Sequence, residues 1–181
     1  MQRKVCAVEK ASHLGGRIRR WLQNPEKILT ECVKEGMTVL DLGSGPGFFA
    51  VQAAKMVGRS GKVIAADLQE GMLEILKEKI EGKEIEDRIV LHKCEKDRIG
   101  IVEKVDCALA FYVVHEVPDE ESLLKELRSI LRPDGTLYMI EPKLHVSRKA
   151  FEETVRKAEK IGFKPLERPR VFLSRAMVFR R

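Results

Sequence analysis

The part of the sequence most informative about the fold is Val39-Leu40-Asp41-Leu42-Gly43-Ser44-Gly45-Pro46-Gly47. An apolar run over residues 38–42 leads directly into three closely spaced glycines, and residues 48–57 then have the composition of a helix. This order predicts a buried strand, a tight turn and a helix. Open α/β sheets bind ligands beyond the carboxyl ends of their strands, where glycine lets a ligand approach the backbone closely. The turn is therefore the first candidate for a binding site.

The alternation of strands and helices continues to the C-terminus. Further strands are predicted over residues 62–67, 89–92, 105–111 and 136–140, with helices over residues 70–80 and 120–131. Beyond Pro142, a helix over residues 148–161 ends at Gly162 and precedes two strand-like segments separated by Pro169. Such alternation is typical of parallel strands joined by right-handed crossovers. We therefore predict an α/β fold with a mostly parallel sheet, helices on both faces and a C-terminal hairpin.

Length and composition favour one folded domain. The chain has 181 residues, of which 44% are hydrophobic and 34% charged, as in ordinary globular proteins. We expect a single domain over residues 1–181, with a helical N-terminal cap (1–35, Pro25 beginning a helix), a core (36–142) and a C-terminal helix and hairpin (143–181). The sequence has neither the roughly 20-residue apolar run of a membrane span nor a secretory signal. A cytoplasmic protein without membrane insertion is the expectation.

Charge is distributed unevenly along the chain, whose net charge is +6. Residues 1–36 hold eight Lys/Arg and four Asp/Glu. Residues 37–142 hold 14 Lys/Arg and 20 Asp/Glu, and residues 143–181 hold 12 Lys/Arg and four Asp/Glu. Basic ends can attract nucleic acid or an anionic substrate. The charges are interleaved with apolar residues, however, which favours an ordinary solvated surface.

The four cysteines are widely scattered and form no Cys-x-x-Cys pair. Neither a disulfide framework nor a metal site is therefore predicted. Cys107 lies in an apolar run and is predicted to be a small buried hydrophobic residue. Thiolates from Cys6, Cys32 and Cys94 could hold a soft ion, although nothing in their spacing requires it.

An acidic residue, Asp67, follows the second predicted strand about 20 residues beyond the glycine turn. In nucleotide-binding α/β folds, an acidic side chain at this position accepts hydrogen bonds from ribose hydroxyls. Its alternative role is to cap the helix that follows. Phe48 stands where a dinucleotide fingerprint has its last glycine, which weighs against a pyrophosphate-binding dehydrogenase.

These features together resemble a known family. The segment 39–47, Asp67 and the later run Leu131-Arg132-Pro133-Asp134-Gly135-Thr136-Leu137 are similar to class I S-adenosylmethionine-dependent methyltransferases, over residues 36–142. The likeness is greatest to the branch that acts on small molecules such as quinones, sterols and arsenite. It implies a Rossmann-like seven-stranded sheet of order 3-2-1-4-5-7-6 with an antiparallel last strand.

The resemblance also implies a site for S-adenosylmethionine, with S-adenosylhomocysteine as the product. Asp41 is implied near the methionyl amine, the glycine turn under the methionine portion, and Asp67 at the ribose. Leu68 and Met72 are implied against the adenine, although ordinary helix packing is an alternative for Met72. The implied cofactor contacts are Asp41, Gly43, Ser44, Gly45, Gly47, Asp67, Leu68, Met72, Glu95, Lys96 and Phe111.

The adenine amino group is implied to bond an acidic residue after the third strand. Alignment of residues 89–94 places Glu95 there, where aspartate is more usual in the family, and Asp97 lies close by. The implied contact therefore lies within residues 95–97. Lys96 is implied to contribute only its backbone.

The methyl acceptor is expected beside residues 111–118, which follow the fourth strand. His115 is the candidate catalytic residue, because an imidazole titrates near neutral pH and can take a proton from an acceptor oxygen, nitrogen or sulfur. Many such enzymes need no base, so a helix-capping or structural role for His115 stays open. In the N-terminal cap, three arginines could clamp an anionic acceptor or form a basic face beside Trp21; they are Arg17, Arg19 and Arg20.

Methyl transfer to an unidentified small-molecule acceptor is thus the predicted activity. The basic ends support an RNA or protein methyltransferase as an alternative, although the Asn-Pro-Pro-Tyr-type motif of base-amine methylation is absent after the fourth strand. A protein that binds S-adenosylmethionine without turnover and a nicotinamide-dependent dehydrogenase are further alternatives. The sequence does not indicate an oligomeric state.

Overall fold

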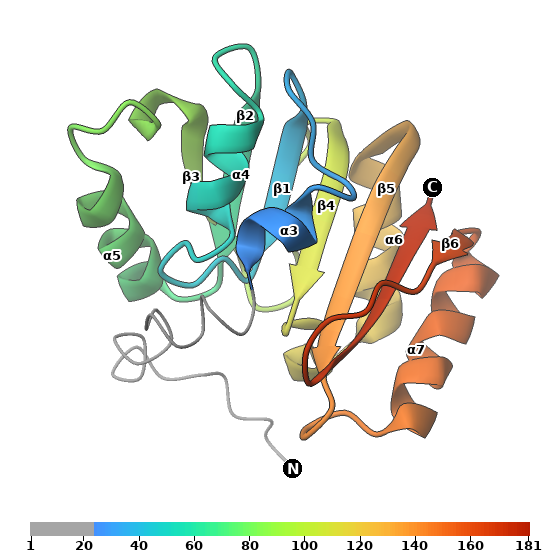
Figure 1. Ribbon diagram of the computed structural model, residues 1–181. Helices are drawn as coiled ribbons and strands as arrows, with labels where there is room; N and C mark the ends of the chain where they lie inside the picture. Colours follow the sequence, from blue (N-terminus) through green and yellow to red (C-terminus); the bar gives the residue numbers. More distant parts are fainter. Residues whose placement is uncertain (1–23) are drawn as a thin grey trace.

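The computed structural model describes residues 24–181, which form one sheet of order β3-β2-β1-β4-β5-β7-β6 (Figure 1). β7 runs antiparallel to its neighbours β5 and β6, and the other adjacent strands are parallel. The predicted fold class, strand order and antiparallel last strand are confirmed. The strands are β1 (Thr38–Leu42), β2 (Lys62–Asp67), β3 (Ile89–Lys93), β4 (Val105–Phe111), β5 (Leu131–Pro142), β6 (Lys164–Glu167) and β7 (Ser174–Arg180).

Helices cover both faces of the sheet. One face carries α3 (Pro25–Leu29), α4 (Ala50–Met56) and α5 (Glu70–Ile80), and the other carries α6 (Glu120–Ile130) and α7 (Arg148–Ile161). Each face has its own apolar cluster, the first containing Leu76 and Tyr138 and the second containing Leu124, Phe151 and Phe179. Because both faces are covered, the central strand β1 is buried along its whole length.

Local sequence signals set the helix ends. Asn24 caps α3 by accepting a hydrogen bond from a backbone amide, and Pro25 occupies the first turn, as predicted. At the start of α7, Ser147 Oγ accepts the amide hydrogen of Ala150 (3.1 Å). Gly162 ends the same helix in the left-handed conformation (φ 102°), which confirms its predicted role.

Two elements, α4 and β5, begin at a different residue from the one predicted. α4 begins at Ala50, because Phe48 and Phe49 belong to the preceding turn, where their rings pack edge to face. β5 begins at Leu131, which the sequence had favoured as the last residue of a helix. Leu131 pairs instead with Val105 of β4, so that a tertiary contact outweighs the local helix preference.

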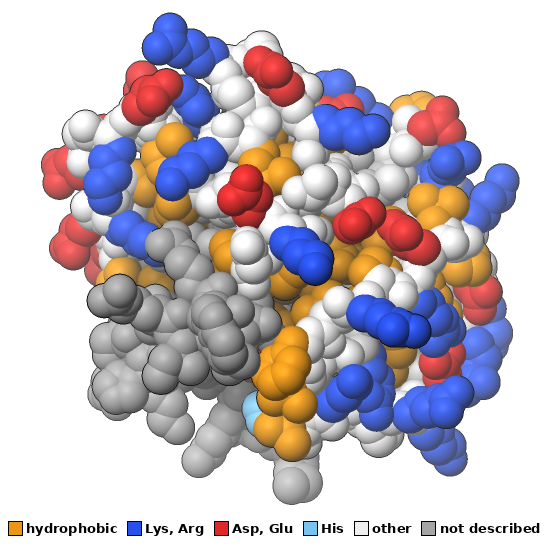
Figure 2. Space-filling model, in the orientation of Figure 1, with side chains coloured by type: hydrophobic (Ala, Val, Ile, Leu, Met, Phe, Trp, Pro, Cys, Tyr) orange, Lys and Arg blue, Asp and Glu red, His pale blue; other side chains and the backbone are white. Residues whose placement is uncertain are grey.

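The surface carries charges of both signs over most of the view in Figure 2. Within residues 24–181, no helix is long and apolar enough to cross a membrane. Residues 24–35 of the predicted N-terminal cap supply α3, which packs against α4. Residues 1–23 of the predicted cap lie outside the described part of the chain, and they include Arg17, Arg19, Arg20 and Trp21.

Candidate functional site

The glycine turn lies at the carboxyl end of β1 and has a backbone that requires glycine. Gly43, Gly45 and Gly47 have φ values of +70°, +52° and +76°, in the region that side chains with a Cβ rarely adopt. A Cβ on Gly47 would lie 2.3 Å from Leu76 Cδ1, whereas a Cβ on Gly45 would meet nothing within 4 Å. Gly47 thus lets α5 pack closely, and Gly45 presents bare backbone on the open side of the turn.

Asp67, at the end of β2, is bonded directly to this turn. Its Oδ2 accepts the amide hydrogen of Gly45 (2.8 Å) and its Oδ1 accepts that of Gln69 (2.8 Å). The N-cap residue of α5 is Gln69, so Asp67 lies two residues before the N-cap position and holds the amide of the N-cap residue itself. A carboxylate has roughly four acceptor positions, and these two bonds leave room for ribose hydroxyls.

Asp41 and Ser44 bring polar atoms into the buried base of the turn. Asp41 is 2% exposed within an apolar strand, where it is paired in register with Ala65 of β2 and Leu109 of β4. Ser44 Oγ is buried and makes no hydrogen bond with any described residue. Buried polar atoms ordinarily have partners, so this arrangement fits a polar ligand group at the turn and suits the implied methionine portion of the cofactor.

The residues implied at the adenine lie at the ends of β2 and β3. Leu68 is 37% exposed, whereas Met72, in the first turn of α5, is 2% exposed. Glu95 lies in a turn that is closed by a hydrogen bond from its backbone N–H to the Arg98 carbonyl oxygen (3.1 Å). The ion pair between the Glu95 and Arg98 side chains lowers the pKa of the Glu95 carboxyl group. The side chains of Leu68 and Glu95 are therefore accessible from solvent, and Lys96 follows in the same turn. These adenine contacts stay predictions.

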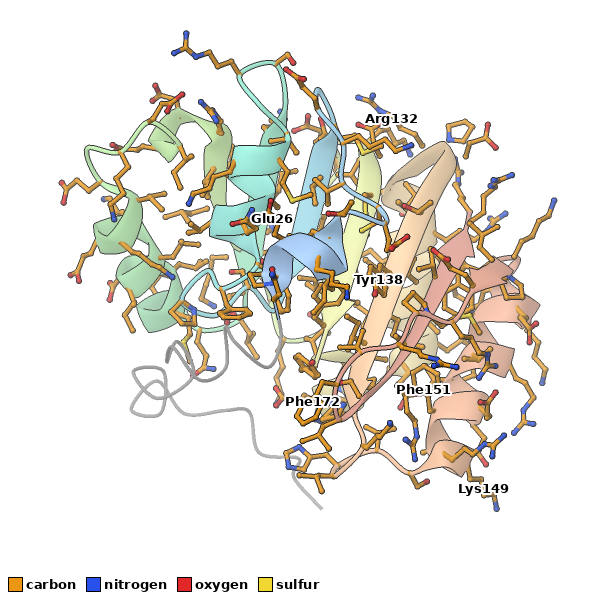
Figure 3. All side chains as sticks on the ribbon, in the orientation of Figure 1. Glu26, Arg132, Tyr138, Lys149, Phe151 and Phe172 are labelled. Atoms are coloured by element: carbon orange, nitrogen blue, oxygen red, sulfur yellow. The ribbon has the colours of Figure 1, made fainter. Side chains whose placement is uncertain are left out.

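Phe111 ends β4, and its ring belongs to the core. It packs edge to face against Phe49 of the glycine turn (4.6 Å between centroids) and Tyr138 of β5 (5.0 Å); Tyr138 is labelled at the middle of the sheet in Figure 3. The Phe111 side chain thus supports the turn from beneath. Only its backbone is placed to make the implied cofactor contact.

On the acceptor side, His115 is paired with a buried carboxylate from β5. Glu141, which is 2% exposed, accepts the Val114 amide hydrogen through Oε1 (3.0 Å) and contacts His115 Nδ1 through Oε2. The His145 ring lies 5.9 Å from the His115 ring. A carboxylate on Nδ1 fixes the orientation of the imidazole and favours the tautomer whose basic nitrogen is Nε2. His115 lies in the single-turn 3-10 helix Val114–Glu116. The N-cap residue of the following α-helix, α6, is Asp119 and not His115.

Glu141 was not among the residues predicted from the sequence. Its signal was present, since Glu141 is an acidic residue at the carboxyl end of an apolar strand, as Asp67 is. Glu116, next to His115, is half-buried, and burial raises its pKa. The charges of Glu141 and Asp67 raise this pKa further, and that of His115 lowers it.

The described cysteines do not suit a soft ion, which corrects the thiolate alternative. Cys32 and Cys94 are buried in the clusters on opposite faces of the sheet. Burial raises the pKa of Cys94 to about 12, and a hydrogen bond with Cys107, followed by burial, raises the pKa of Cys32. Cys107 is fully buried, as predicted. Cys6 lies outside the described residues.

Known proteins with similar sequences are methyltransferases. The model of a methyltransferase domain family matches residues 33–166. The ubiquinone/menaquinone biosynthesis C-methyltransferase UbiE of Francisella tularensis subsp. novicida is 32% identical over 125 residues, which are 67% of this chain and 50% of that protein. The demethylmenaquinone methyltransferase of Lactobacillus johnsonii is 33% identical over 110 residues, 60% of this chain and 45% of that protein. The chain thus spans about half the length of these relatives.

A solved structure matches almost the whole chain. The S-adenosylmethionine-dependent methyltransferase from Aquifex aeolicus has 30% sequence identity and a TM-score of 0.84, over 97% of this chain and 98% of that one. The match therefore extends beyond the core to the C-terminal helix and hairpin.

Proposed function

Because the chain belongs to the S-adenosylmethionine-dependent methyltransferases, we propose that it transfers a methyl group from S-adenosylmethionine to a small-molecule acceptor. The observation that carries the proposal is the bond between Asp67 and Gly45 (2.8 Å). It joins the residue proposed to bind the ribose to the backbone proposed to lie under the methionine portion. One rigid unit then serves both parts of the cofactor.

The residues of the turn suit their proposed roles. S-adenosylmethionine, when bound, supplies an electrophilic methyl group on a sulfonium sulfur. Asp41 carries a carboxylate that complements the charge of an ammonium group, and Ser44 Oγ offers a buried hydroxyl. Asp67 accepts from hydroxyl groups, while Gly45 lets the ligand lie on the backbone. The chain thus provides complementary chemistry for the amine and the ribose.

The acceptor is proposed to lie beside His115. When the acceptor attacks the methyl group, its O–H, N–H, S–H or C–H proton must leave. His115 takes that proton at Nε2, and Glu141 stabilises the resulting imidazolium from the Nδ1 side. Holding the acceptor in line with the methyl group supplies a further large part of the rate.

A small acceptor is favoured over a macromolecule by the relatives, one of which is named as a ubiquinone/menaquinone biosynthesis C-methyltransferase and another as a demethylmenaquinone methyltransferase. Quinone precursors contain phenolic oxygens whose deprotonation would make use of a base such as His115. We therefore propose a phenolic or similar small molecule as the first class of acceptor to examine.

The proposal is tested by titrating the purified protein with S-adenosylmethionine, S-adenosylhomocysteine and NAD in a calorimeter, followed by assays of S-adenosylhomocysteine formation with phenolic and thiol acceptors. Micromolar affinity for both adenosyl ligands, weakened in Asp67→Ala, together with acceptor-dependent product, is the expected result. Affinity for NAD alone would contradict the proposal. Binding of both adenosyl ligands without turnover on phenols, thiols or RNA would instead support a non-catalytic binding protein.

A further inference from the structure

A hollow of about 480 Å³ opens between the first turn of α7, the start of β7 and the loop from β6 to β7. Phe151 of α7, labelled in Figure 3, forms part of its wall. Among the described residues, the lining contains one acidic side chain, Glu152, and five cationic ones. We call this the basic hollow, and its cationic residues are Lys143, Arg148, Arg168, Arg170 and Arg175.

The acidic residue of the basic hollow is already neutralised. Arg168 forms a two-pronged ion pair with Glu152, with N–O distances of 2.6 and 2.8 Å, and this contact lowers the pKa of the Glu152 carboxyl group. The other four cationic side chains form no ion pair with any described residue. Like charges gathered in one concave site repel one another and focus a positive potential that attracts anions.

Arg175 gives the basic hollow a donor that lacks a partner. Its Nε is buried and makes no hydrogen bond with any described residue, which is unusual for a buried polar atom. Arg175 of β7 and Arg148 of the first turn of α7 both line this hollow. Guanidinium groups bind carboxylates and phosphates through paired hydrogen bonds, and the positive end of the α7 dipole adds to the attraction.

Exposed apolar side chains lie beside the cationic side chains of the basic hollow. Leu144, Phe172 and Leu173 are 85%, 50% and 53% exposed, and the bond from the Lys143 amide to the Leu173 carbonyl (3.0 Å) joins the two segments that carry them. Figure 2 shows an apolar patch at the lower centre, next to a group of Lys and Arg side chains, and Figure 3 labels Phe172 at that place. Leu173 has a positive φ of 50°, a strained conformation for a branched side chain.

We propose that the basic hollow binds the phosphate group of an amphipathic ligand, whose apolar part lies over Leu144, Phe172 and Leu173. This site is distinct from the cofactor turn and goes beyond the proposed methyl transfer. It adjoins the acceptor side, because Arg175 of β7 is the register partner of Glu141 in β5. The ligand is either a soluble molecule or a lipid headgroup, since both present the same chemistry.

Binding experiments without cofactor or turnover test this site separately from the proposed activity. The probes are octyl phosphate below its micellar concentration, orthophosphate, and vesicles of phosphatidylcholine with or without phosphatidylglycerol. The variants are Arg170→Gln, which changes an exposed loop residue, and Arg175→Gln. Arg59→Gln is the matched control, because its side chain is 88% exposed and lies outside the basic hollow.

We expect octyl phosphate to bind more tightly than orthophosphate, with affinity about tenfold lower in each hollow variant, as for loss of one charged hydrogen bond, and unchanged in Arg59→Gln. That result identifies a soluble amphipathic ligand. Binding only to vesicles that contain phosphatidylglycerol, with the same dependence on Arg170 and Arg175, identifies a lipid headgroup. If no probe binds, or if all three variants bind equally well, the proposal is wrong.

Discussion

Asp67 and Gly45 lie 22 positions apart in the sequence, and a hydrogen bond of 2.8 Å joins the carboxylate of one to the amide of the other. The bond fastens the end of β2 to the turn that follows β1. Since the second carboxylate oxygen holds the Gln69 amide at the start of α5, Asp67 supports three segments at once. Asp67, which is proposed to bind the ribose, therefore also stabilises the fold around the turn.

Replacing Asp67 with asparagine tests its proposed roles in stability and in cofactor binding. An amide has a single acceptor oxygen, so that one of the two backbone amides loses its partner. We expect a loss of about 1–2 kcal/mol in the free energy of unfolding and at least a tenfold loss of affinity for S-adenosylmethionine. Urea denaturation and calorimetry measure the two quantities. Asp87→Asn, at an exposed position away from the glycine turn, should change neither. Full cofactor affinity in Asp67→Asn would contradict the ribose role.

Alanine at Gly47 should destabilise the fold through a steric clash. Gly47 and Gly82 have similar φ values of +76° and +68°, but only at Gly47 does a Cβ meet a side chain, at 2.3 Å from Leu76. Alanine in the left-handed region costs about 1–2 kcal/mol at either position, and overpacking adds about 1–3 kcal/mol at Gly47. Urea denaturation of both variants measures the difference. Equal losses would show that α5 yields to the extra methyl group.

Gly45→Ala should weaken cofactor binding more than it lowers the stability of the fold. A Cβ there meets no protein atom within 4 Å, so the expected loss of stability is close to that of Gly82→Ala. The added methyl group would occupy the face on which the cofactor is proposed to lie. Calorimetry should therefore show weakened binding of S-adenosylhomocysteine in Gly45→Ala and unchanged binding in Gly82→Ala.

Glu141→Gln tests whether the buried carboxylate positions His115. The amide oxygen can still accept the Val114 amide hydrogen, but the side chain no longer stabilises a charged imidazole. We expect kcat to fall about tenfold to a hundredfold with little change in KM for S-adenosylmethionine, since base catalysis contributes roughly 10²–10⁴ in all. The pH–rate profile should change shape in this variant, and Glu141→Asp should recover part of the rate. Parental kcat and an unchanged profile would limit Glu141 to a structural role.

Glu116 makes stability depend on pH in a definite direction. Burial, followed by the nearby carboxylates, raises its pKa in the folded protein above the ordinary value of 4.5. Its stabilising contribution is therefore complete below that value and is lost as pH rises through the folded pKa. Glu116→Gln should have a higher Tm than the parent protein at pH 7, and the difference should vanish near pH 4. Thermal melts across this range measure it, with the exposed Glu153→Gln as the control.

The fold was predictable because its signals are local and repeated. The short segment from the apolar run before Gly43 to the residues after Phe49 is enough to predict a strand, a turn and a helix in order. The start of β5 was not predictable in this way. Leu131 follows an amphipathic helix without a break in pattern, and only its pairing with Val105, far away in the sequence, makes it a strand residue.

The site was predictable in part for a similar reason. Asp67 stands at a fixed distance from the glycine turn and ends a recognisable strand, and the structure brings the two together. The pairing of His115 with Glu141 depends on how the ends of β4 and β5 lie relative to each other, and no spacing in the sequence encodes this. The basic hollow likewise forms only when α7 packs beside the β6–β7 loop.

The contact between Gly43 and Val113 links the two sides of the site. A Cβ on Gly43 would lie 3.0 Å from the Val113 side chain, so the turn after β1 and the turn that carries His115 rest directly on each other. A ligand that shifts one turn is therefore expected to affect the other. By thermodynamic linkage, whatever factor the cofactor exerts on acceptor affinity, the acceptor exerts on cofactor affinity. We therefore expect binding of the cofactor and of the proposed acceptor to be coupled, and replacement of Val113 to change the size of that coupling.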